Sequence, residues 1–119
     1  MSAPVKGKLA MTPTERAEVD GMVAASFAIV AILRALPLTT WEAVEVRVLA
    51  GRVLHGSGKE CSDAAWGAAV RTLRGNRLID EVNYQSTVFW SLGPEHEICD
   101  TVGWPDECAA KVLTTRKAG

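Results

Sequence analysis

A run of thirteen residues, "GMVAASFAIVAIL" from Gly21 to Leu33, contains no charged side chain and constrains the fold more than any other stretch of the chain. The run is too short to cross a bilayer, which takes about 20 apolar residues in a helix. We therefore expect a buried helix and no membrane contact. A helix that is apolar on nearly every side must be covered from several directions. It is either the central helix of the domain or part of a dimer interface, and we expect a homodimer through this helix.

Capping signals set the limits of this first helix. In "TPTE", Thr12 is placed as the cap and Glu15 can bond back to it. Pro13 takes the first helical position, where its missing N–H group costs nothing. Pro37 forces the helix to end near Leu36. The sequence therefore predicts a helix over residues 12–36.

A second capping box, "TTWE", follows with Thr39 as the cap. Apolar residues then recur at helical spacing, although "VEVRV" also fits the alternation of a strand. The capping box favours a helix, and the glycines and serine of "HGSGKEC" predict a turn from His55 to Cys61. The apolar stripe of this second helix consists of Trp41, Val44, Val48, Leu49 and Val53.

The stretch "SDAAWGAAVRTLRGNRLIDEV" predicts a third helix that runs into a strand. Ser62 can cap the helix, Asp63 suits its positive end, and Gly75 terminates it. The face expected to point inward consists of Trp66, Ala69, Val70 and Leu73. The face expected to point outward consists of Ala64, Gly67, Ala68, Arg71 and Arg74.

Two β-prone runs, "RLIDEV" and "TVFWSL", flank a polar interval at Asn83–Ser86 and predict a hairpin. The remainder of the chain holds one possible short helix, Asp106–Leu113. With 119 residues and a hydrophobic fraction of 48%, the chain fits one globular domain. We expect a flexible arm over 1–11, the domain over 12–93, and an extension over 94–119 that packs on the domain or trails from it. Trp41, Trp66 and Trp90 are expected in the core, whereas Trp104 either covers it or anchors a partner.

Charge is distributed unevenly along the chain, although the net charge is only −1. Residues 45–77 carry six basic and three acidic side chains, a net charge of +3, and residues 78–119 carry three basic and seven acidic ones, a net charge of −4. A protein that coats nucleic acid without sequence preference draws on a large excess of Lys and Arg. Such coating is not expected, but a basic middle segment needs a partner or a structural reason.

The order helix, helix, turn, helix, hairpin resembles the winged helix-turn-helix family over about residues 14–92. "AAWGAAVRTLRGNRLIDEV" is similar to the recognition helix and first wing strand of that family, with a core stripe, two outward arginines, Gly75-Asn76 at the helix end and "LIDE" in the strand. The resemblance implies an α+β, mainly α, winged-helix fold and binding to double-stranded DNA. The third helix would lie in a major groove, and Lys6 and Lys8 of the arm could reach the backbone. The implied contact residues are Thr39, Thr40, Lys59, Ser62, Ala64, Gly67, Ala68, Arg71, Arg74 and Arg77.

Two features leave a second interpretation open. The expected wing turn "NYQS" has no basic residue, and acidic residues follow the hairpin. Cations are also favoured in the last turn of any helix, so Arg71, Arg74 and Arg77 could simply be solvated there. The alternatives are a DNA-binding transcriptional regulator and a winged-helix adaptor or inhibitor that binds a protein. The small size fits a phage or mobile-element protein.

No enzyme, metal site or cofactor is expected. His96, Cys99 and Cys108 are residue types that bind zinc, but their spacing lacks a paired C-x2-C unit. The alternative is that the two cysteines are small buried side chains and His96 is exposed. "GSGK" lacks the spacing of a phosphate-binding loop. An odd number of cysteines without a secretion signal indicates free thiols and a cytoplasmic protein.

Overall fold

The computed structural model describes residues 11–35, 40–99 and 103–118, with side chains described as far as Thr114. The fold is α+β and mainly helical. The described part contains the α-helices α2 (Pro13–Ala35), α3 (Ala43–Gly56), α4 (Asp63–Gly75) and α5 (Trp104–Ala118), and the short 3-10 helix η1 (His96–Ile98). One antiparallel sheet contains β1 (Trp41–Glu42), β2 (Ile79–Tyr84) and β3 (Thr87–Leu92). The expected Lys6/Lys8 arm lies outside the described residues.

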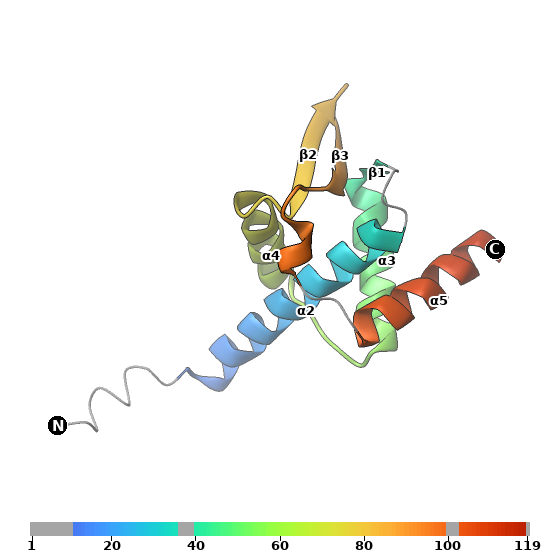
Figure 1. The fold of residues 1–119 in the computed structure, drawn as a ribbon. Coiled ribbons are helices and arrows are strands. Elements are labelled where there is room, and N and C mark those ends of the chain that lie inside the picture. The colour runs from blue at the N-terminus through green and yellow to red at the C-terminus, as the bar shows by residue number, and fades with distance from the viewer. Residues whose placement is uncertain (1–10, 36–39, 100–102, 119) are drawn as a thin grey trace.

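Helix α2 is the central helix of the molecule, which is one of the two arrangements that its sequence predicts. Its capping box is present, because the Thr12 N–H donates to Glu15 Oε1 (2.9 Å) and the Glu15 N–H donates to Thr12 Oγ1 (3.1 Å). Residues 28–33 of α2 are all buried, and Ile29, Val30 and Ile32 are fully inaccessible to solvent. Helix α4 lies on one side of α2, and α3 and α5 lie on the other (Figure 1). One chain therefore supplies the cover that the apolar run requires.

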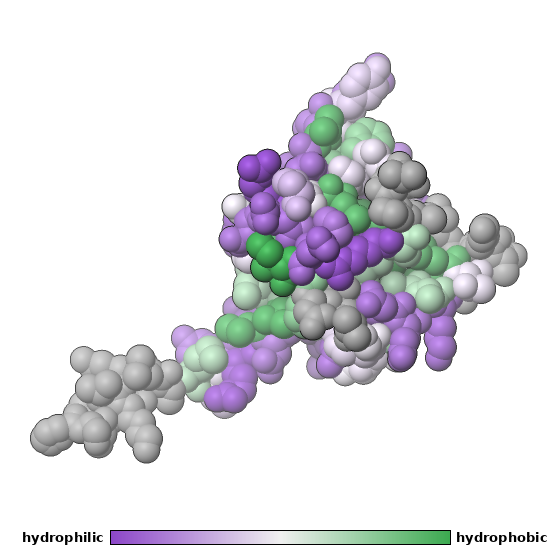
Figure 2. Space-filling view, in the orientation of Figure 1, coloured by the Kyte–Doolittle hydropathy of each residue, from purple (hydrophilic) through white to green (hydrophobic). Residues whose placement is uncertain are grey.

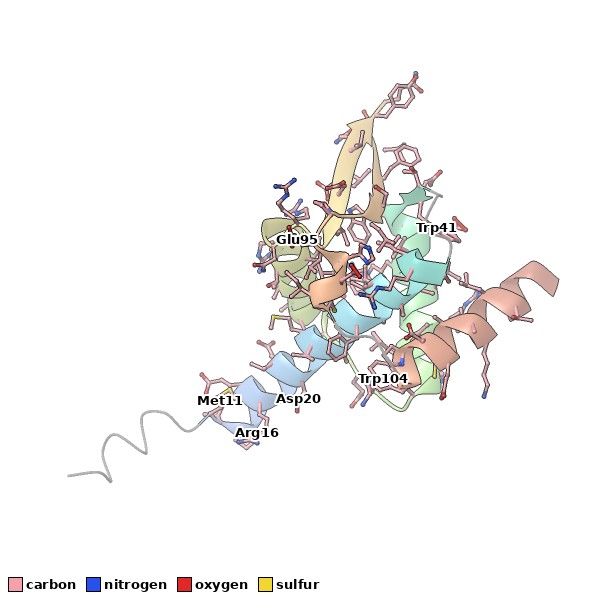
Figure 3. The ribbon with its side chains drawn as sticks, in the orientation of Figure 1. Met11, Arg16, Asp20, Trp41, Glu95 and Trp104 are labelled. Atoms are coloured by element: carbon pink, nitrogen blue, oxygen red, sulfur yellow. The ribbon has the colours of Figure 1, made fainter. Side chains whose placement is uncertain are left out.

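The first turns of α2 project from the body of the molecule. Residues 11–20 are all exposed, and the side chains labelled Met11, Arg16 and Asp20 lie along this projection (Figure 3). Figure 2 shows the projection mainly in hydrophilic colours, with hydrophobic atoms where it meets the body. Within the described ranges, no helix combines the length and hydropathy that a membrane span requires.

The sheet has the order β1-β3-β2, so the two-residue strand β1 pairs with β3, which is the central strand. Trp90 of β3 pairs with Trp41 of β1 on one side and with Glu81 of β2 on the other. The turn consists of only Gln85 and Ser86, with φ values of 50° and 66°, which is the two-residue turn that suits the twist of a hairpin. The expected polar interval was too long, because Asn83 and Tyr84 are the last residues of β2.

The prediction for the start of the second helix was wrong. Trp41 and Glu42 form a strand, and α3 begins at Ala43 with Glu42 as a cap that makes no side-chain hydrogen bond. Thr39, the expected cap, lies outside the described residues. Trp41 is 4% exposed because pairing with β3 places it against the core. The buried face of α3 consists of Val46, Leu49, Ala50, Val53 and Leu54.

This later start changes which valines of α3 face the solvent. Val44 is 74% exposed and Val48 is 51% exposed, although both were expected in the apolar stripe. Leu49 and Val53 are buried as predicted. The expected stripe mixed two faces of the helix, because it was counted from Trp41, which is not helical.

The third helix agrees closely with its prediction. The Ala65 N–H donates to Ser62 Oγ (3.1 Å), and α4 ends at Gly75. Trp66, Ala69 and Leu73 are buried and Val70 is half-buried. The left-handed residue after the helix is Arg77 (φ 61°) rather than Gly75. Its carbonyl accepts the Glu95 N–H, so the turn after α4 is tied to the chain beyond the hairpin.

Helix α5 contains the predicted segment Asp106–Leu113 and is longer than expected at both ends. It packs against α2 and α3, with Pro105 and Ala109 buried in the contact. Trp104 is half-buried at the start of α5 (Figure 3). The Lys59 ammonium lies 4.9 Å from the centroid of its ring. Trp104 therefore covers the core, which is one of the two roles expected for it.

Candidate functional site

An open groove of about 720 Å³ lies between the outer side of α4, the start of α3 and the hairpin. It contains three of the four arginines of α3 and α4, namely Arg47, Arg71 and Arg74, together with two glutamates. The groove is lined by Glu42, Ala43, Val44, Arg47, Trp66, Gly67, Val70, Arg71, Arg74, Glu81, Ser86, Thr87, Val88 and Trp90.

The floor of the groove contains two packed aromatic rings. The Trp66 and Trp90 rings lie 6.3 Å apart between centroids with an interplanar angle of 30°. Trp66 belongs to the buried face of α4 and Trp90 to the central strand, so the two rings join the helix to the sheet. Aromatic contacts of this kind add about 0.5–1.5 kcal/mol beyond the burial of area. The walls of the groove are therefore held in a fixed relation.

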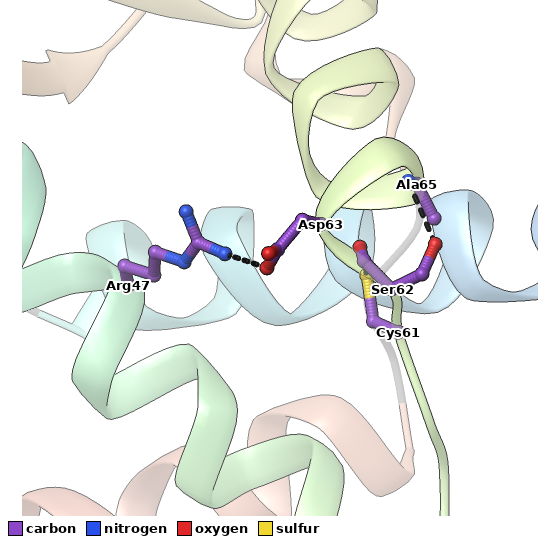
Figure 4. A network of polar contacts seen from close by, with 5 residues as sticks. All are labelled: Arg47, Cys61, Ser62, Asp63 and Ala65. Atoms are coloured by element: carbon purple, nitrogen blue, oxygen red, sulfur yellow. Dashed lines mark hydrogen bonds and ion pairs between the residues drawn. The ribbon is translucent and has the colours of Figure 1, made fainter.

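Two of the three groove arginines are already paired. Arg47 forms an ion pair with Asp63 in the first turn of α4 (Figure 4), and its guanidinium carbon lies 5.3 Å from the centroid of the Trp66 ring. Arg74 donates from Nη1 to Glu81 Oε2 at 2.9 Å. Each arginine therefore faces a carboxylate from a neighbouring element.

Arg71 differs from these two arginines. It is exposed, and it forms no ion pair or hydrogen bond with any residue that the structure describes. Its guanidinium lies along the helix beside Gly67, where a Cβ would sit 3.4 Å from Arg71 Nη1. The absence of a side chain at Gly67 leaves room for this arrangement, and the five N–H donors of Arg71 remain available for a ligand.

Glu81 is the acidic counterpart of Arg74 in the groove. Its Oε1 accepts the Trp90 indole N–H at 2.9 Å while Oε2 accepts from Arg74. The Trp90 hydrogen bond and, to a smaller degree, Arg74 lower the pKa of the Glu81 carboxyl below its ordinary value, against the opposing effect of partial burial. Glu81 is therefore a carboxylate, not a carboxylic acid, at neutral pH.

The structure brings together in the groove three of the residues expected at the site. Gly67, Arg71 and Arg74 line the groove, and Ala64 and Ala68 continue the outer face of α4 at helical spacing. Ala64 is exposed, and Gly67 and Ala68 are half-buried. This face consists of small side chains in the first two turns of α4 and guanidinium groups after them.

The other expected site residues lie elsewhere or have another role. Lys59 lies over Trp104 in a separate hollow beside α2. The Ser62 hydroxyl accepts the Ala65 N–H, so it is engaged in capping α4. Arg77 lies in the turn after α4 and is not among the residues of the groove. Thr40 is exposed just before β1, and Thr39 lies outside the described residues.

Sequence reasoning did not place Arg47, Glu42 or Glu81 at the site. Arg47 was counted only as part of the basic middle segment, since its pairing with Asp63 joins two helices across a turn. Glu81 reaches the groove through the hairpin register, which sets it opposite Trp90. A two-residue turn at Gln85-Ser86 is the signal that would have given this register.

The candidate metal ligands do not come together. No group of three His, Cys, Asp or Glu side chains suited to a metal ion occurs among the described residues. His96 is half-buried, not exposed as expected, and Arg34 donates from Nη2 to its carbonyl. Cys99 is buried, and Cys108 lies 2.9 Å from the Ser57 hydroxyl. Burial raises the pKa of the Cys61 thiol, since desolvation outweighs the lowering effect of Arg47.

Comparison with known proteins gives no match: none of the protein-family models, curated proteins or solved structures corresponds to this chain. The site is accordingly defined by its own geometry. It is an open groove with an aromatic floor, one arginine that is unpaired among the described residues on a helix face of small residues, and two further arginines held by carboxylates.

Proposed function

We propose that this protein is a small winged-helix DNA-binding protein that regulates transcription, with α4 as the helix that enters the major groove. The element order α2-β1-α3-α4-β2-β3 and the sheet order β1-β3-β2 are compatible with a winged helix. In such a protein the helix that follows the turn contacts base edges, and the hairpin lies beside the same duplex. The hairpin here projects next to α4 (Figure 1).

The observation that carries the proposal is the unpaired Arg71 on the small-residue face of α4. Ala64, Gly67 and Ala68 allow the helix backbone to approach a duplex closely, because they add little bulk. Arg71 follows one turn later with free donors, and an arginine can bind guanine O6 and N7 with two hydrogen bonds. In this proposal, the unpaired Arg71 and the small-residue face of α4 both contact the same ligand, duplex DNA.

Binding to duplex DNA at several salt concentrations tests the proposal. Fluorescence anisotropy with random duplexes and genomic fragments should show an affinity that falls with salt. Arg71→Ala should lower the affinity for the preferred fragment about tenfold, which corresponds to one lost base contact. Arg52→Ala is the matched control, because Arg52 is an exposed arginine of α3 outside the groove and should change the affinity less than twofold. No duplex binding even at low salt would overturn the proposal.

The exposed valines of α3 favour a second candidate, a winged-helix adaptor that binds a protein. Val44 lines the groove and Val48 lies one turn further along the same face, so the apolar floor extends onto an exposed surface. A protein partner would cover these side chains, whereas duplex DNA would not require them. If a protein is the partner, Val44→Ser should weaken the protein complex, and if DNA is the ligand, the same uncharged substitution should leave duplex affinity within about threefold.

The homodimer is also a proposal, and it concerns a different surface. Val19 and Val23 are 39% and 41% exposed one helical turn apart on α2, Val19 in its projecting turns and Val23 just after them. A second copy could pack on this face, although the buried half of α2 is already covered within one chain. Light scattering on the wild-type protein and on Val23→Glu tests it, since a dimer through α2 should dissociate in the variant.

A further inference from the structure

A carboxylate is fixed within the groove assigned above to DNA. Glu81 lies directly opposite Trp90 in the hairpin, and its Oε1 accepts the indole N–H at 2.9 Å. Trp90 is 4% exposed, and a buried N–H group without an acceptor costs about 1–3 kcal/mol. The Trp90 N–H therefore holds the Glu81 carboxylate in place even when Arg74 turns away from it.

The same carboxylate engages the arginine at the end of α4. Arg74 donates to Oε2 at 2.9 Å, and the two side chains are 43% and 29% exposed. Exposed ion pairs are weak, with typical strengths of about 0–1 kcal/mol, so a phosphate could compete for Arg74. The competing phosphate would still meet the negative charge of Glu81, because Trp90 keeps that charge in the groove.

The ion pair of Arg47 with Asp63 differs from the ion pair of Arg74 with Glu81 in how firmly the carboxylate is held. Its partner Asp63 has a side chain that is 95% exposed, and the Arg47 contact is its only hydrogen bond or ion pair in the described part of the chain. Asp63 can swing into solvent when a phosphate approaches Arg47. Glu81 cannot do so without leaving a buried indole N–H unsatisfied, and so it is the carboxylate that the fold fixes at the site.

We propose that Glu81 is a specificity-determining residue that lowers the affinity of the groove for DNA of arbitrary sequence. Binding without sequence preference comes from neutralising phosphates. Glu81 occupies Arg74 and repels phosphates, while among the described residues it forms no hydrogen bond or ion pair with Arg71, the residue proposed to contact a base. Glu81 thus raises the ratio of specific to non-specific affinity, which is the quantity that matters among many competing sites. This inference rests on the proposed function.

The test is the affinity of Glu81→Gln for random-sequence duplexes between 50 and 200 mM salt. Glutamine retains an oxygen for the Trp90 N–H and loses the charge. We expect Glu81→Gln to bind random duplexes at least threefold more tightly at 50 mM salt. The slope of log affinity against log salt should steepen by about 0.9, because Arg74 gains one phosphate contact. Between 50 and 200 mM salt, Glu81→Gln should therefore lose about threefold more affinity for random duplexes than the wild type loses.

Asp80→Asn is the matched control. Asp80 is the neighbour of Glu81 on β2 and points to the opposite face of the sheet, so its replacement removes the same charge outside the groove. It should change the affinity for random duplexes less than twofold and leave the slope unchanged. The double variant Arg74→Ala/Glu81→Gln should return to the wild-type slope, since the freed arginine is then missing.

Two outcomes of the Glu81→Gln measurement would overturn the inference, and they are distinguishable. If the wild type binds duplexes but Glu81→Gln behaves like Asp80→Asn, the inference fails and the proposed function stands. If neither the wild type nor Glu81→Gln binds any duplex, both fail. Arg74→Ala in the wild-type background is an independent measurement should Glu81→Gln fold poorly. It should leave the salt slope unchanged, and a slope shallower by about 0.9 would show that Arg74 already contacts phosphate.

Discussion

Trp90 and Glu81 face each other across the two long strands, and the indole N–H of Trp90 donates to the carboxylate of Glu81 at 2.9 Å. Because the second oxygen of Glu81 accepts from Arg74, one side chain joins the central strand, the hairpin edge and the last turn of α4. The contact between the Trp66 and Trp90 rings joins the same helix and the central strand through apolar packing. The position of α4 relative to the hairpin is thus fixed by packing and by charge.

The Glu81 contacts should make stability depend on pH in the acidic range. The pKa of Glu81 in the folded protein lies below its ordinary value of 4.5, chiefly through the Trp90 hydrogen bond. A carboxyl with a lowered pKa stabilises the fold fully above its unfolded-state pKa and loses this contribution as pH falls through the folded-state pKa. The difference in unfolding free energy between the wild type and Glu81→Gln should be largest above about pH 5 and shrink toward pH 3.

Urea denaturation at several pH values provides this measurement. Asp80→Asn serves as the control on the other face of the same strand, since it leaves the Trp90 and Arg74 contacts intact. A difference between wild type and Glu81→Gln that stays constant from pH 7 to pH 3 would contradict the assigned role of these two contacts.

Gly93 should tolerate no side chain. A Cβ at this position would lie 2.2 Å from the Arg77 carbonyl oxygen, and that backbone is held by hydrogen bonds from Gly93 N–H to Leu78 O and from Glu95 N–H to Arg77 O. Gly93→Ala should therefore lower the unfolding free energy by about 1–3 kcal/mol or more, the usual effect of overpacking. Gly51→Ala is the control, because Gly51 is an exposed helical glycine with open space around its Cβ position. It should raise stability by about 0.5–1 kcal/mol. Thermal denaturation of both variants is the measurement that tests these two expected changes in stability.

The parts of the fold that depend on local signals could be predicted from the sequence. The Thr12–Glu15 box, the Ser62 cap and the buried stripe of α4 depend on residues within a few positions of one another. The start of α3 could not be predicted, because Trp41 and Glu42 pair with a strand about 50 residues later. Tertiary pairing overrode a local capping signal there.

The residues of the candidate site also divide into those that a local pattern predicts and those that depend on tertiary contacts. The outer face of α4 was predicted from helical spacing, and Arg71 and Gly67 lie on it as expected. The partners of the other arginines depend on the approach of separate elements. Asp63 meets Arg47 across the α3–α4 turn, and Glu81 meets Arg74 through the hairpin register. These contacts decide which guanidinium is free, and a linear pattern does not contain them.

The Ser62 cap should contribute measurably to the stability of the fold. Its hydroxyl accepts the Ala65 N–H at 3.1 Å, and replacement of such a cap by alanine costs about 1 kcal/mol. Ser62→Ala should lower the unfolding free energy by about this amount, whereas Ser62→Asp should retain it, because a carboxylate also caps a helix. Equal stability of Ser62→Ala and the wild type in urea denaturation would show that the cap is not required.

A substitution at Gly67 can distinguish an effect on stability from an effect on the proposed DNA binding. Gly67→Leu replaces a helical glycine on a half-buried surface, and leucine has a higher helix propensity by about 0.5–1 kcal/mol. The new side chain should displace Arg71, whose Nη1 lies 3.4 Å from the Cβ position, and hold the helix backbone away from a duplex. We expect stability to stay level or rise while affinity for the preferred duplex falls about tenfold or more. Gly51→Ala supplies the control, since it should raise stability without changing DNA affinity. If Gly67→Leu binds duplexes as tightly as the wild type, the outer face of α4 does not enter the major groove.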